Sequence, residues 1–496
     1  MKPIFSLLFL FTFLAIGCAQ KEASINQFLE QEKQIHQLLE SYHASGVAVA
    51  IVKNGKVVYQ KGFGYRNYEE KLAVDANTIF GIGSVTKSFT ASLVGILEDE
   101  RLLSINDSPR KYLENLEFYN DDMNEKVTMH HILNHATGIS NMSSESSSIL
   151  FRASNPKEII PKLKYLPPSN TVGKELMYNN MMYGLSSLVV EKITGKSWEK
   201  NIEQRIFKPL RMNNSYTSYR SAMKNKNLAF GYAVDSIVPS RILSENIPIN
   251  APAGSIFSSV NDMAKWMEVW MSEEDQILSK EYIKKATESY LEFPSGNDSV
   301  LPKPYYGYGW LIRKYNDGLK RIEHSGGVSG YTSNLVMFPK EKIGVVVLTN
   351  QSNSSLAFAV TDIFLKELVN KKANEHPIGF SQKHTITPNT PTVINEKNKP
   401  TYGLNELVGK YHHPGYGEFI ISYDGTTLYA DFPFTKFRLI HDGGDTFLDR
   451  FAEEIPLMMW NFMRFEFIKN KKNQIDGVNL NFDRNGVFFK RINNHK

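Results

Sequence analysis

The sequence predicts an α+β protein with a second, smaller β unit at its C-terminal end. Strand-like segments occur near the start of the folded region and return after residue 305, and the residues between them are mostly helical. Strands from distant parts of a chain that share one sheet, with helices between them, form an α+β layer architecture. After a stretch with scattered prolines, short strands alternate closely with turn residues, which predicts a small β-barrel or sandwich.

Hydrophobic periodicity and turn signals predict the elements of the larger unit in order. Apolar residues at helical spacing indicate a helix from Ile25 to Tyr42, followed by a hairpin of two strands around Asn54-Gly55. A second helical stripe begins near Ser84, and an amphipathic helix is expected around Leu356 to Val369. The clearest other pieces are the helical MHHILNH, YGLSSLVVEKITG and DMAKWMEVWM, and the strand-like YGYGWLI, RIEHSG, YTSNLVMF and IGVVVLTN.

Changes of composition predict four segments along the chain. Residues 1–18 read as a signal segment and residues 25–371 as the α+β domain. Residues 372–404 contain prolines among polar residues without periodicity, which is typical of an interdomain linker. Residues 405–496 form the β unit, with turns expected at Asp424-Gly425, Asp442-Gly443-Gly444 and Asn485-Gly486.

Composition and charge exclude several functional classes. With 42% apolar and 22% charged residues the chain is that of a globular protein, and its net charge of +5 is mild and spread out. A nucleic-acid partner would call for a basic face or stripe, and the sequence gives no sign of one. His131 and His135 stand four apart on a predicted helix, but the glutamate of a zinc-binding HEXXH motif is absent. We therefore expect no metal and no other cofactor.

The N-terminal segment indicates secretion and attachment to a membrane. Lys2 precedes an apolar run from Ile4 to Ile16, which is too short to span a bilayer and reads as a signal-peptide core. The run ends in LAIGC, which resembles a bacterial lipobox, and Cys18 is the one cysteine of the chain. Cys18 could alternatively be a buried thiol inside the fold, but the position of Cys18 directly after the signal core favours its lipidation. The sequence thus predicts an envelope lipoprotein, either periplasmic or facing the surface, with its membrane contact through the N-terminal lipid.

The stretch GIGSVTKSF places Ser84 three residues before Lys87 at the start of a helix. Residues three apart on a helix are neighbours, so the two side chains are expected to meet. Serine is a weak nucleophile until a base takes its proton, and a poorly hydrated lysine can be that base. The ordinary alternative is a helix N-cap, because the same spacing recurs in this chain. It recurs at Ser108, Ser154, Ser197 and Ser221.

Two further motifs supply possible partners for Ser84. Tyr178-Asn179-Asn180 stands at a predicted loop-to-helix junction, where the phenol could carry a proton. His324-Ser325-Gly326-Gly327 ends a predicted strand, and its glycines allow close approach of the backbone. Each pattern is weak alone, since Tyr-x-Asn also occurs at residues 65–67 and His-x-Gly at His413 and His441.

Taken together and in this order, the three motifs resemble the serine β-lactamase and penicillin-binding-protein superfamily. The resemblance covers residues 25 to 371 and is greatest to the class C β-lactamase, esterase and D-aminopeptidase branch. It extends to the blocks IFGIGSVTKSFTASLVGILEDERLLSIND, VTMHHILNHATGI, YGLSSLVVEKITGKSWEKNIEQRIFKPLRM, APAGSIFSSVNDMAKWM and HSGGVSGYTSNLVMFP. The fold it implies is an antiparallel sheet flanked by helices, with a helical insertion. The C-terminal region, beginning ELVGKYHHPGYGEFIISYDGTTLYA, is similar to the lipocalin-like barrel of some members.

The resemblance implies a role for each motif residue. Ser84 would be the acylated nucleophile, Lys87 its proton acceptor and Tyr178 a proton shuttle. Asn180 would bind Lys87 and the substrate. The backbone N–H groups of Ser84 and Gly327 would form an oxyanion hole, in which each donor is typically worth ~10²–10³ in rate.

The HSG motif departs from much of the family and bears on the substrate. His324, Ser325 and Gly326 would border the substrate, and many β-lactamases and penicillin-binding proteins have lysine where this chain has His324. A histidine with an ordinary pKa is mostly neutral at pH 7, so it grips a carboxylate less well than lysine does. We therefore expect a serine hydrolase acting on an ester or a small peptide amide, as an esterase or a peptidase of D-amino-acid or cell-wall peptides.

Three alternatives remain open at this point. The protein could be a β-lactamase, or a penicillin-binding sensor that is acylated with slow or no turnover. The barrel could also carry the function by binding an apolar ligand, because its strands are rich in aromatic residues. Small barrels fill their interiors with such side chains in any case. These residues include Phe432, Phe434, Phe437 and Phe447.

Substitution of Cys18 tests the prediction of a lipid anchor. We expect Cys18→Ser to leave the signal segment uncleaved or the mature chain without lipid. In a fractionated bacterial host, less protein should then partition into detergent. A variant that is processed and membrane-bound like the parent would refute the lipoprotein assignment.

Overall fold

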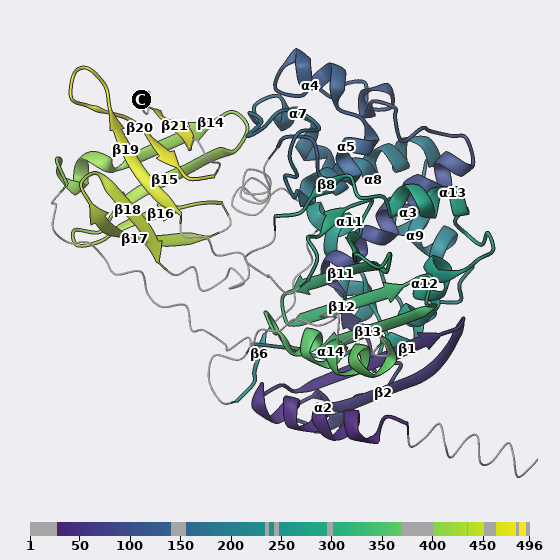
Figure 1. The fold of residues 1–496 in the computed structure, drawn as a ribbon. Helices are drawn as coiled ribbons and strands as arrows, with labels where there is room; N and C mark the ends of the chain where they lie inside the picture. Colours follow the sequence, from purple (N-terminus) through teal and green to yellow (C-terminus); the bar gives the residue numbers. More distant parts are fainter. Residues whose placement is uncertain are drawn as a thin grey trace, which may run out of the picture.

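The computed structural model describes residues 27–139, 155–233, 238–242, 248–294, 301–369, 400–433, 435–450, 463–482 and 486–492. Cys18 and residues 370–399 of the predicted linker region lie outside these ranges. Figure 1 shows an α+β unit and a separate β-barrel in the described part of the chain. No helix within these ranges combines the length and apolarity needed to cross a bilayer.

The core of the larger unit is an antiparallel sheet whose central strands come from opposite ends of the domain. Strand β1 pairs with β2 in a hairpin through Asn54-Gly55 and, on its other side, with β13, where Val47 faces Thr349. The predicted sheet built from distant segments is therefore confirmed. Among the described residues the order is β3-β2-β1-β13-β12-β11-β10-β9-β8. The strands are β1 Gly46–Lys53, β2 Lys56–Asn67, β3 Leu72–Ala73, β8 Leu291–Glu292, β9 Tyr305–Tyr306, β10 Leu311–Lys314, β11 Lys320–Val328, β12 Tyr331–Phe338 and β13 Ile343–Thr349.

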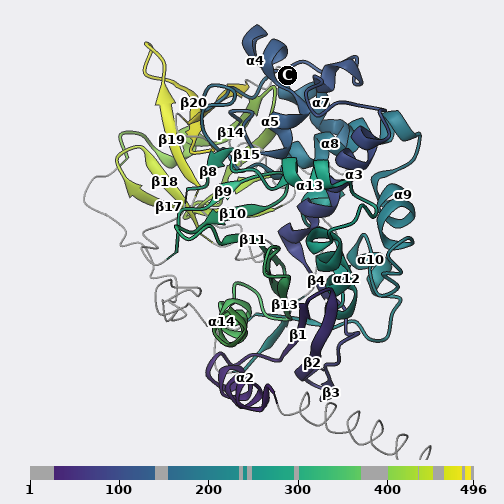
Figure 2. The same ribbon diagram turned by 45° about the vertical axis from the view of Figure 1, so that its right-hand side comes forward.

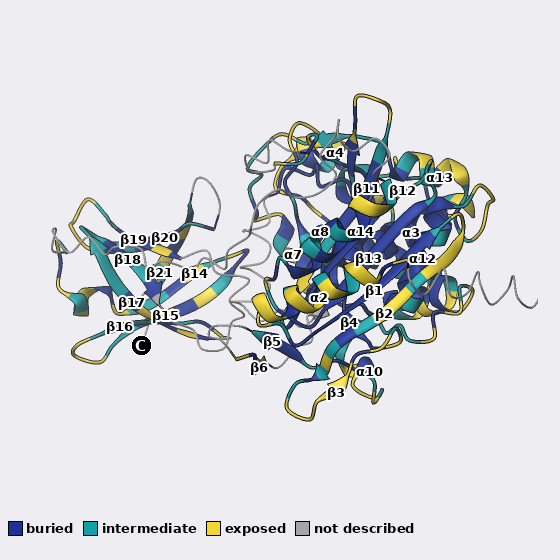
Figure 3. Ribbon diagram, turned by 60° about the horizontal axis from the view of Figure 1, so that its bottom comes forward, coloured by how far each residue is buried: buried dark blue, intermediate teal, exposed yellow. Residues whose placement is uncertain are grey.

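Strand β1 is apolar along nearly its whole length because both faces of the sheet are covered. Successive side chains of a strand point to opposite faces. Val47, Val49 and Ile51 accordingly join one hydrophobic cluster, whereas Ala48 and Ala50 join the other. Helices α2 (Leu29–Ser41) and α14 (Leu356–Val369) cover the first face, as Figure 2 shows, and Figure 3 shows the buried central strands. The sheet is thus the middle of three layers.

The helical insertion covers the second face of the sheet. Its helix α3 (Thr86–Asp99) is buried from Thr86 to Leu97, so it runs through the interior of the domain. Helix α12 (Val260–Met271) packs on the sheet, where its buried Met267 lies against Gly344 of β13, and its buried Trp266 stacks on Phe89 of α3. The remaining α-helices are α4 Asp121–Lys126, α5 Met129–Leu133, α7 Ile160–Leu163, α8 Asn180–Thr194, α9 Trp198–Ile202, α10 Tyr219–Ala222, α11 Ala251–Gly254 and α13 Lys280–Ala286.

The C-terminal unit is a closed antiparallel barrel in which strands β14 to β21 pair in chain order. Aromatic side chains fill it: Phe419 stacks on Tyr411 and on Phe432 with ring centroids 5.6 and 4.5 Å apart. The small barrel expected from the sequence is confirmed, whereas its predicted likeness to lipocalins stays a prediction. Its strands are β14 Gly409–His413, β15 Gly417–Tyr423, β16 Leu428–Asp431, β17 Lys436–Gly443, β18 Thr446–Arg450, β19 Arg464–Lys469, β20 Ile475–Leu480 and β21 Val487–Ile492.

A buried ion cluster joins β10 to β11. The carboxylate of Glu323 accepts hydrogen bonds from Arg313 Nε and Arg321 Nε, both at 2.7 Å, and all three side chains are at most 6% exposed. Burial acts to raise the pKa of Glu323, but the charges of Arg321 and Arg313 outweigh it and lower the pKa. Removing one member of a buried ion pair leaves an uncompensated charge in the interior.

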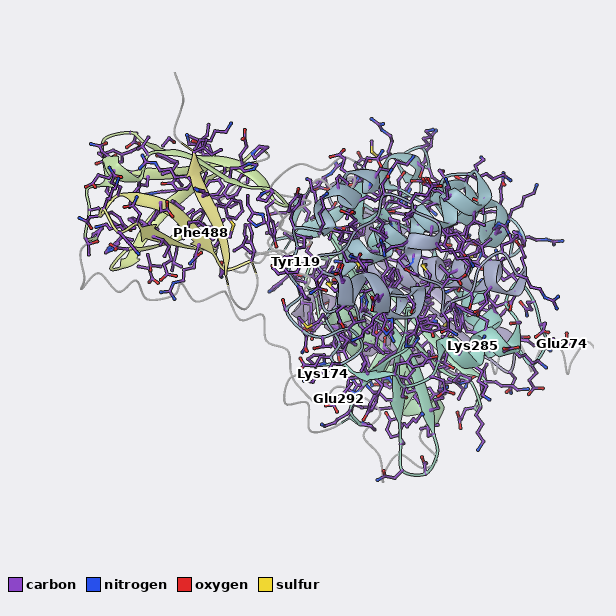
Figure 4. All side chains as sticks on the ribbon, turned by 90° about the horizontal axis from the view of Figure 1, so that it is seen from above. Tyr119, Lys174, Glu274, Lys285, Glu292 and Phe488 are labelled. Carbon is purple, nitrogen blue, oxygen red and sulfur yellow. The ribbon has the colours of Figure 1, made fainter. Side chains whose placement is uncertain are left out.

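We expect Glu323→Gln to lower the free energy of unfolding by about 3–5 kcal/mol, because two guanidinium groups lose their shared partner. Urea denaturation followed by circular dichroism measures the change. Glu292, labelled in Figure 4, provides the matched control, because its pair with Lys303 is exposed at the surface. Glu292→Gln should leave the transition nearly unchanged. Equal losses in the two variants would contradict a stabilising role for the cluster.

Candidate active site

Ser84 lies in a tight turn rather than at the N-cap of the long helix. The 3₁₀ turn Gly83–Val85, labelled η1, leads directly into α3, which begins at Thr86, two residues later than the sequence pattern indicated. Gly83 has a φ of +51°, a left-handed conformation that glycine adopts without steric cost. The turn therefore presents Ser84 ahead of the helix, with Lys87 in the first helical turn.

The amine of Lys87 is buried against Ser84. Its Nζ is 3.0 Å from Ser84 Oγ and donates a hydrogen bond to the carbonyl oxygen of Ala253, also at 3.0 Å. The side chain is 0% exposed, and the rings of Tyr178 and Tyr183 lie 4.7 and 5.6 Å from Nζ. This arrangement meets the geometric requirement for a base that takes a hydroxyl proton, which is a heavy-atom distance of about 2.6–3.2 Å.

The recurring Ser-x-x-Lys spacing is explained differently at the other described positions. Ser197 caps helix α9 by accepting a hydrogen bond from the backbone N–H of Lys200, and Ser108 caps the turn Pro109–Lys111 in the same way. Ser221 belongs to a capping box with Ser218. Ser154 lies outside the described residues. The hydroxyls of Ser108, Ser197 and Ser221 thus form hydrogen bonds with the local backbone, whereas that of Ser84 contacts the side chain of its lysine.

Glycines bring strand β11 into direct contact with the turn that holds Ser84. A Cβ atom on Gly83 would lie 2.5 Å from the backbone nitrogen of Gly327, and one on Gly326 would lie 1.9 Å from the carbonyl oxygen of Ile82. Ser333 of β12 fixes the same carbonyl by donating a hydrogen bond of 2.8 Å. Gly327, half of the predicted oxyanion hole, is therefore held beside Ser84.

Tyr178 and Asn180 come from the junction of a loop with α8. Asn179 is the N-cap of this helix: its side-chain oxygen accepts a hydrogen bond from the backbone N–H of Met182. Asn180 is the first helical residue, and the ring of Tyr178 lies over the Lys87 amine. The structure thus brings Ser84, Lys87 and Tyr178 together, while the contacts predicted for Asn180 stay a prediction.

His324 is buried with both ring nitrogens engaged by the protein. Its Nδ1 donates to the carbonyl oxygen of Ser325 at 2.6 Å, so Nε2 accepts a hydrogen bond from the hydroxyl of Tyr306 at 2.9 Å. Burial, and then the charge of Lys87, lower the pKa of His324 to about 3. The ring is therefore neutral at physiological pH, and a substrate would meet no free ring nitrogen here.

Ser325 lies between two residues that face the site. Its backbone carbonyl orients His324, and in the sheet it pairs with Asn334 of β12. Asn334 in turn donates a hydrogen bond to Thr361 of α14, on the far side of the sheet. Residues directly opposite each other in an antiparallel pair share one face of the sheet, so the side chain of Ser325 stands on the same side as that of Asn334. Contact of its side chain with substrate stays a prediction.

Two residues near the site escaped the sequence analysis as functional candidates. The ring of His135 lies against Tyr178, and Tyr306 contacts both His135 and His324. His135 lies in the VTMHHILNHATGI block of the family resemblance, and its spacing from His131 suggests a metal motif rather than a contact with Tyr178. Within the described ranges, no group of three or more His, Cys, Asp or Glu side chains is placed to hold a metal. Tyr306 carries no local signal, because its role depends on a neighbour across the sheet.

Comparison with known proteins places this chain in a family. A protein-family model described as Beta-lactamase matches residues 32–369. The chain belongs to the beta-lactamase family. A second model, described as a domain of unknown function (DUF3471), matches residues 395–493, the region that contains the barrel. The family resemblance and the α+β fold with an added barrel are thereby confirmed.

Similar proteins come from Staphylococcus aureus and Aspergillus violaceofuscus. Protein flp of Staphylococcus aureus (strain NCTC 8325 / PS 47) is 27% identical over 336 residues, which is 67% of this chain and 65% of that protein. This chain thus spans just under two thirds of the length of Protein flp. The Unguisins hydrolase ungD of Aspergillus violaceofuscus (strain CBS 115571) is 26% identical over 432 residues, 78% of this chain and 75% of that one.

A solved structure resembles nearly the whole chain. The structure of the octameric penicillin-binding protein homologue from Pyrococcus abyssi is 28% identical in sequence, with a TM-score of 0.62. The match covers 93% of this chain and 99% of that one. The likeness therefore extends over both the beta-lactamase domain and the C-terminal region.

The contact between Gly326 and Ile82 predicts a sensitive position. We expect Gly326→Ala to displace the Ser84 turn, because the added methyl group would overlap the Ile82 carbonyl. Labelling of Ser84 by a fluorophosphonate probe should slow by about 100-fold, as for other misplacements near 1 Å. Gly403→Ala is the control, because its Cβ would meet only the end of the Glu406 side chain, at 3.5 Å. Unchanged labelling of Gly326→Ala would show that this approach does not position the serine.

Proposed function

We propose that this protein is a serine hydrolase that forms an acyl-enzyme at Ser84 with an ester or a small peptide amide. The observation that carries the proposal is the buried Lys87 amine 3.0 Å from Ser84 Oγ, within a chain of the beta-lactamase family. The name of the relative Unguisins hydrolase adds support for hydrolysis as the reaction class.

In the acylation step, Ser84 Oγ attacks the substrate carbonyl carbon while its proton passes to the neutral amine of Lys87. The resulting oxyanion would be bound by the backbone N–H groups of Ser84 and Gly327, which the contact of Gly83 with Gly327 keeps close. Breakage of the bond to the leaving group then needs a proton. Tyr178 would pass that proton from Lys87 to the departing alcohol or amine, and the position of its ring beside the Lys87 amine supports this role.

Deacylation repeats these transfers with water as the nucleophile. A water molecule attacks the acyl carbon and gives its proton to the Tyr178–Lys87 pair, and the ester bond to Ser84 breaks. Ser84 Oγ takes the proton back, and the carboxylic acid leaves. The net reaction is the addition of one water to an ester or amide bond, which needs no cofactor.

The neutral state of His324 favours a substrate without a carboxylate at this position. A lysine here would present a positive charge, but His324 has a pKa of about 3 and uses both nitrogens within the protein. A carboxylate would therefore find no cation on this residue. We propose neutral esters and small peptide amides as the preferred substrates, with cell-wall-derived peptides among them, and attachment to the envelope through Cys18.

Activity-based labelling tests the proposal. A fluorophosphonate probe should label purified protein lacking residues 1–18 at the peptide GIGSVTK, and Ser84→Ala should abolish both labelling and turnover. Ser197→Ala is the matched control, because Ser197 has the same spacing to a lysine but acts as a helix cap. Labelling lost in Ser197→Ala, or turnover kept in Ser84→Ala, would contradict the mechanism.

A substrate panel separates the remaining alternatives. We expect p-nitrophenyl esters and D-amino-acid amides to be hydrolysed with a higher kcat/KM than nitrocefin, which carries a carboxylate. Lys87→Ala and Tyr178→Phe should lose ~10²–10⁴ in rate while keeping the fold, because they remove proton transfers. Labelling of Ser84 without turnover of any substrate would instead support a slow or non-catalytic sensor.

A further inference from the structure

We propose that His135 is a positioning residue that fixes Tyr178 beside Lys87 by holding the backbone on both sides of Tyr178 and packing on its ring. The inference rests on the proposed acylation of Ser84, in which Tyr178 carries protons. His135 itself touches neither Ser84 nor the reacting atoms in this account. Its effect passes through Tyr178.

His135 accepts two hydrogen bonds from the residues on either side of Tyr178. The carbonyl oxygen of His135 accepts a hydrogen bond from the backbone N–H of Met177 at 2.8 Å, and its Nδ1 accepts one from the backbone N–H of Asn179 at 3.1 Å. Asn179 is also the N-cap of α8 and donates from its side chain to Ile139 at 2.9 Å. The residues on either side of Tyr178 are therefore tied to one histidine.

The imidazole ring also contacts the phenol directly. The ring centroids of His135 and Tyr178 are 4.2 Å apart. The rings of Tyr306 and Tyr183 also surround His135, with centroids 4.7 and 5.2 Å from its own. His135 is 0% exposed, so its ring has no room to turn away. Rings packed this closely restrict the sideways movement of Tyr178 over the Lys87 amine.

The backbone of His135 is held in an uncommon conformation. Its φ of +62° is left-handed, which few residues other than glycine adopt. Such a conformation persists where the surroundings over-determine it. Here the two hydrogen bonds to residues 177 and 179 supply that constraint.

The hydrogen bonds also fix the protonation of the ring. Because Nδ1 accepts from Asn179, the ring proton is on Nε2. A second proton on Nδ1 would face the N–H of Asn179 and break this contact. Burial is the largest cause that holds the pKa of His135 well below its ordinary value, followed by the charge of Lys87. The groups that face the ring, the three tyrosines and Lys87, offer no anion to reverse this direction.

The substitution His135→Asn separates the ring from the backbone contact. The Asn side-chain oxygen can accept from Asn179 much as Nδ1 does, and asparagine tolerates a left-handed φ. The packing of the ring on Tyr178, and with it the packing on Tyr306 and Tyr183, is removed while the backbone contact is kept. We expect kcat/KM for a p-nitrophenyl ester to fall about 10- to 100-fold through misplacement of Tyr178, with KM changing by less than about threefold.

His131→Asn is the matched control. His131 lies four residues earlier, and its Nδ1 also accepts a backbone hydrogen bond, from Thr128 at 3.2 Å. No ring contact links it to Tyr178, so the same substitution should leave kcat/KM near that of the parent.

A double-mutant cycle with Tyr178→Phe decides whether His135 acts through Tyr178. If it does, adding His135→Asn to Tyr178→Phe should cause little further loss, because the hydroxyl to be positioned is already absent. Losses that add fully would overturn the inference and indicate a general structural role. Should His135→Asn fail to fold, His135→Phe, which keeps a ring and loses the acceptor, is read in the same cycle by the same criterion.

Labelling of the parent protein distinguishes the two levels of the argument. A parent that is not labelled at Ser84 overturns the proposed function and this inference with it. A parent that is labelled, together with additive losses in the cycle, overturns the inference alone.

Discussion

The site depends on one close approach between two pieces of backbone. The Ile82–Gly83 segment meets Gly326 and Gly327 of β11 at distances that leave no room for a Cβ atom on Gly83 or Gly326. Ser84 and helix α3 with Lys87 follow Gly83 directly in the chain, so this contact sets their position. Since β11 belongs to the sheet and α3 to the helical insertion, the same contact joins the two halves of the domain.

A second junction brings the third motif to the same place. The loop before α8 is tied to His135 by hydrogen bonds on both sides of Tyr178, and His135 belongs to the turn after α5. Tyr306 of β9 packs on His135 and donates a hydrogen bond to His324 of β11. The aromatic contacts therefore connect the loop of Tyr178 back to the strand that holds Gly327, so the turn, the loop and the strand position one another.

The sequence allowed more of the fold to be predicted than of the site. The hairpin at Asn54-Gly55, the helix from Leu356 and the closed barrel all follow from local signals, namely turn residues and apolar spacing, and the structure confirms them. The pairing of Ser84 with Lys87 was predictable in part, since residues three apart on a helix are neighbours, although Ser84 itself lies in the turn before α3 and the same spacing elsewhere in the chain gives helix caps. The neutral state of His324 at pH 7 was expected from the ordinary pKa of histidine, but the hydrogen bond that occupies its Nε2 was less accessible, because it comes from Tyr306, eighteen residues away in the chain and two strands away in the sheet. The same holds for His135, whose contacts with Tyr178 and Asn179 join residues more than forty positions apart and leave no local pattern.

The two faces of β11 show why a neutral histidine suits this position. On the face toward α14, Arg321 and Glu323 form part of a charged cluster in which each charge has a partner. On the other face, His324 is buried near Lys87, and its burial is the largest cause that lowers its pKa, followed by the charge of Lys87. A fixed charge buried at residue 324 would be costly to desolvate and would need a substrate anion to balance it. Because burial keeps His324 neutral, the site needs no such anion, and this supports the proposed preference for substrates without a carboxylate at this position.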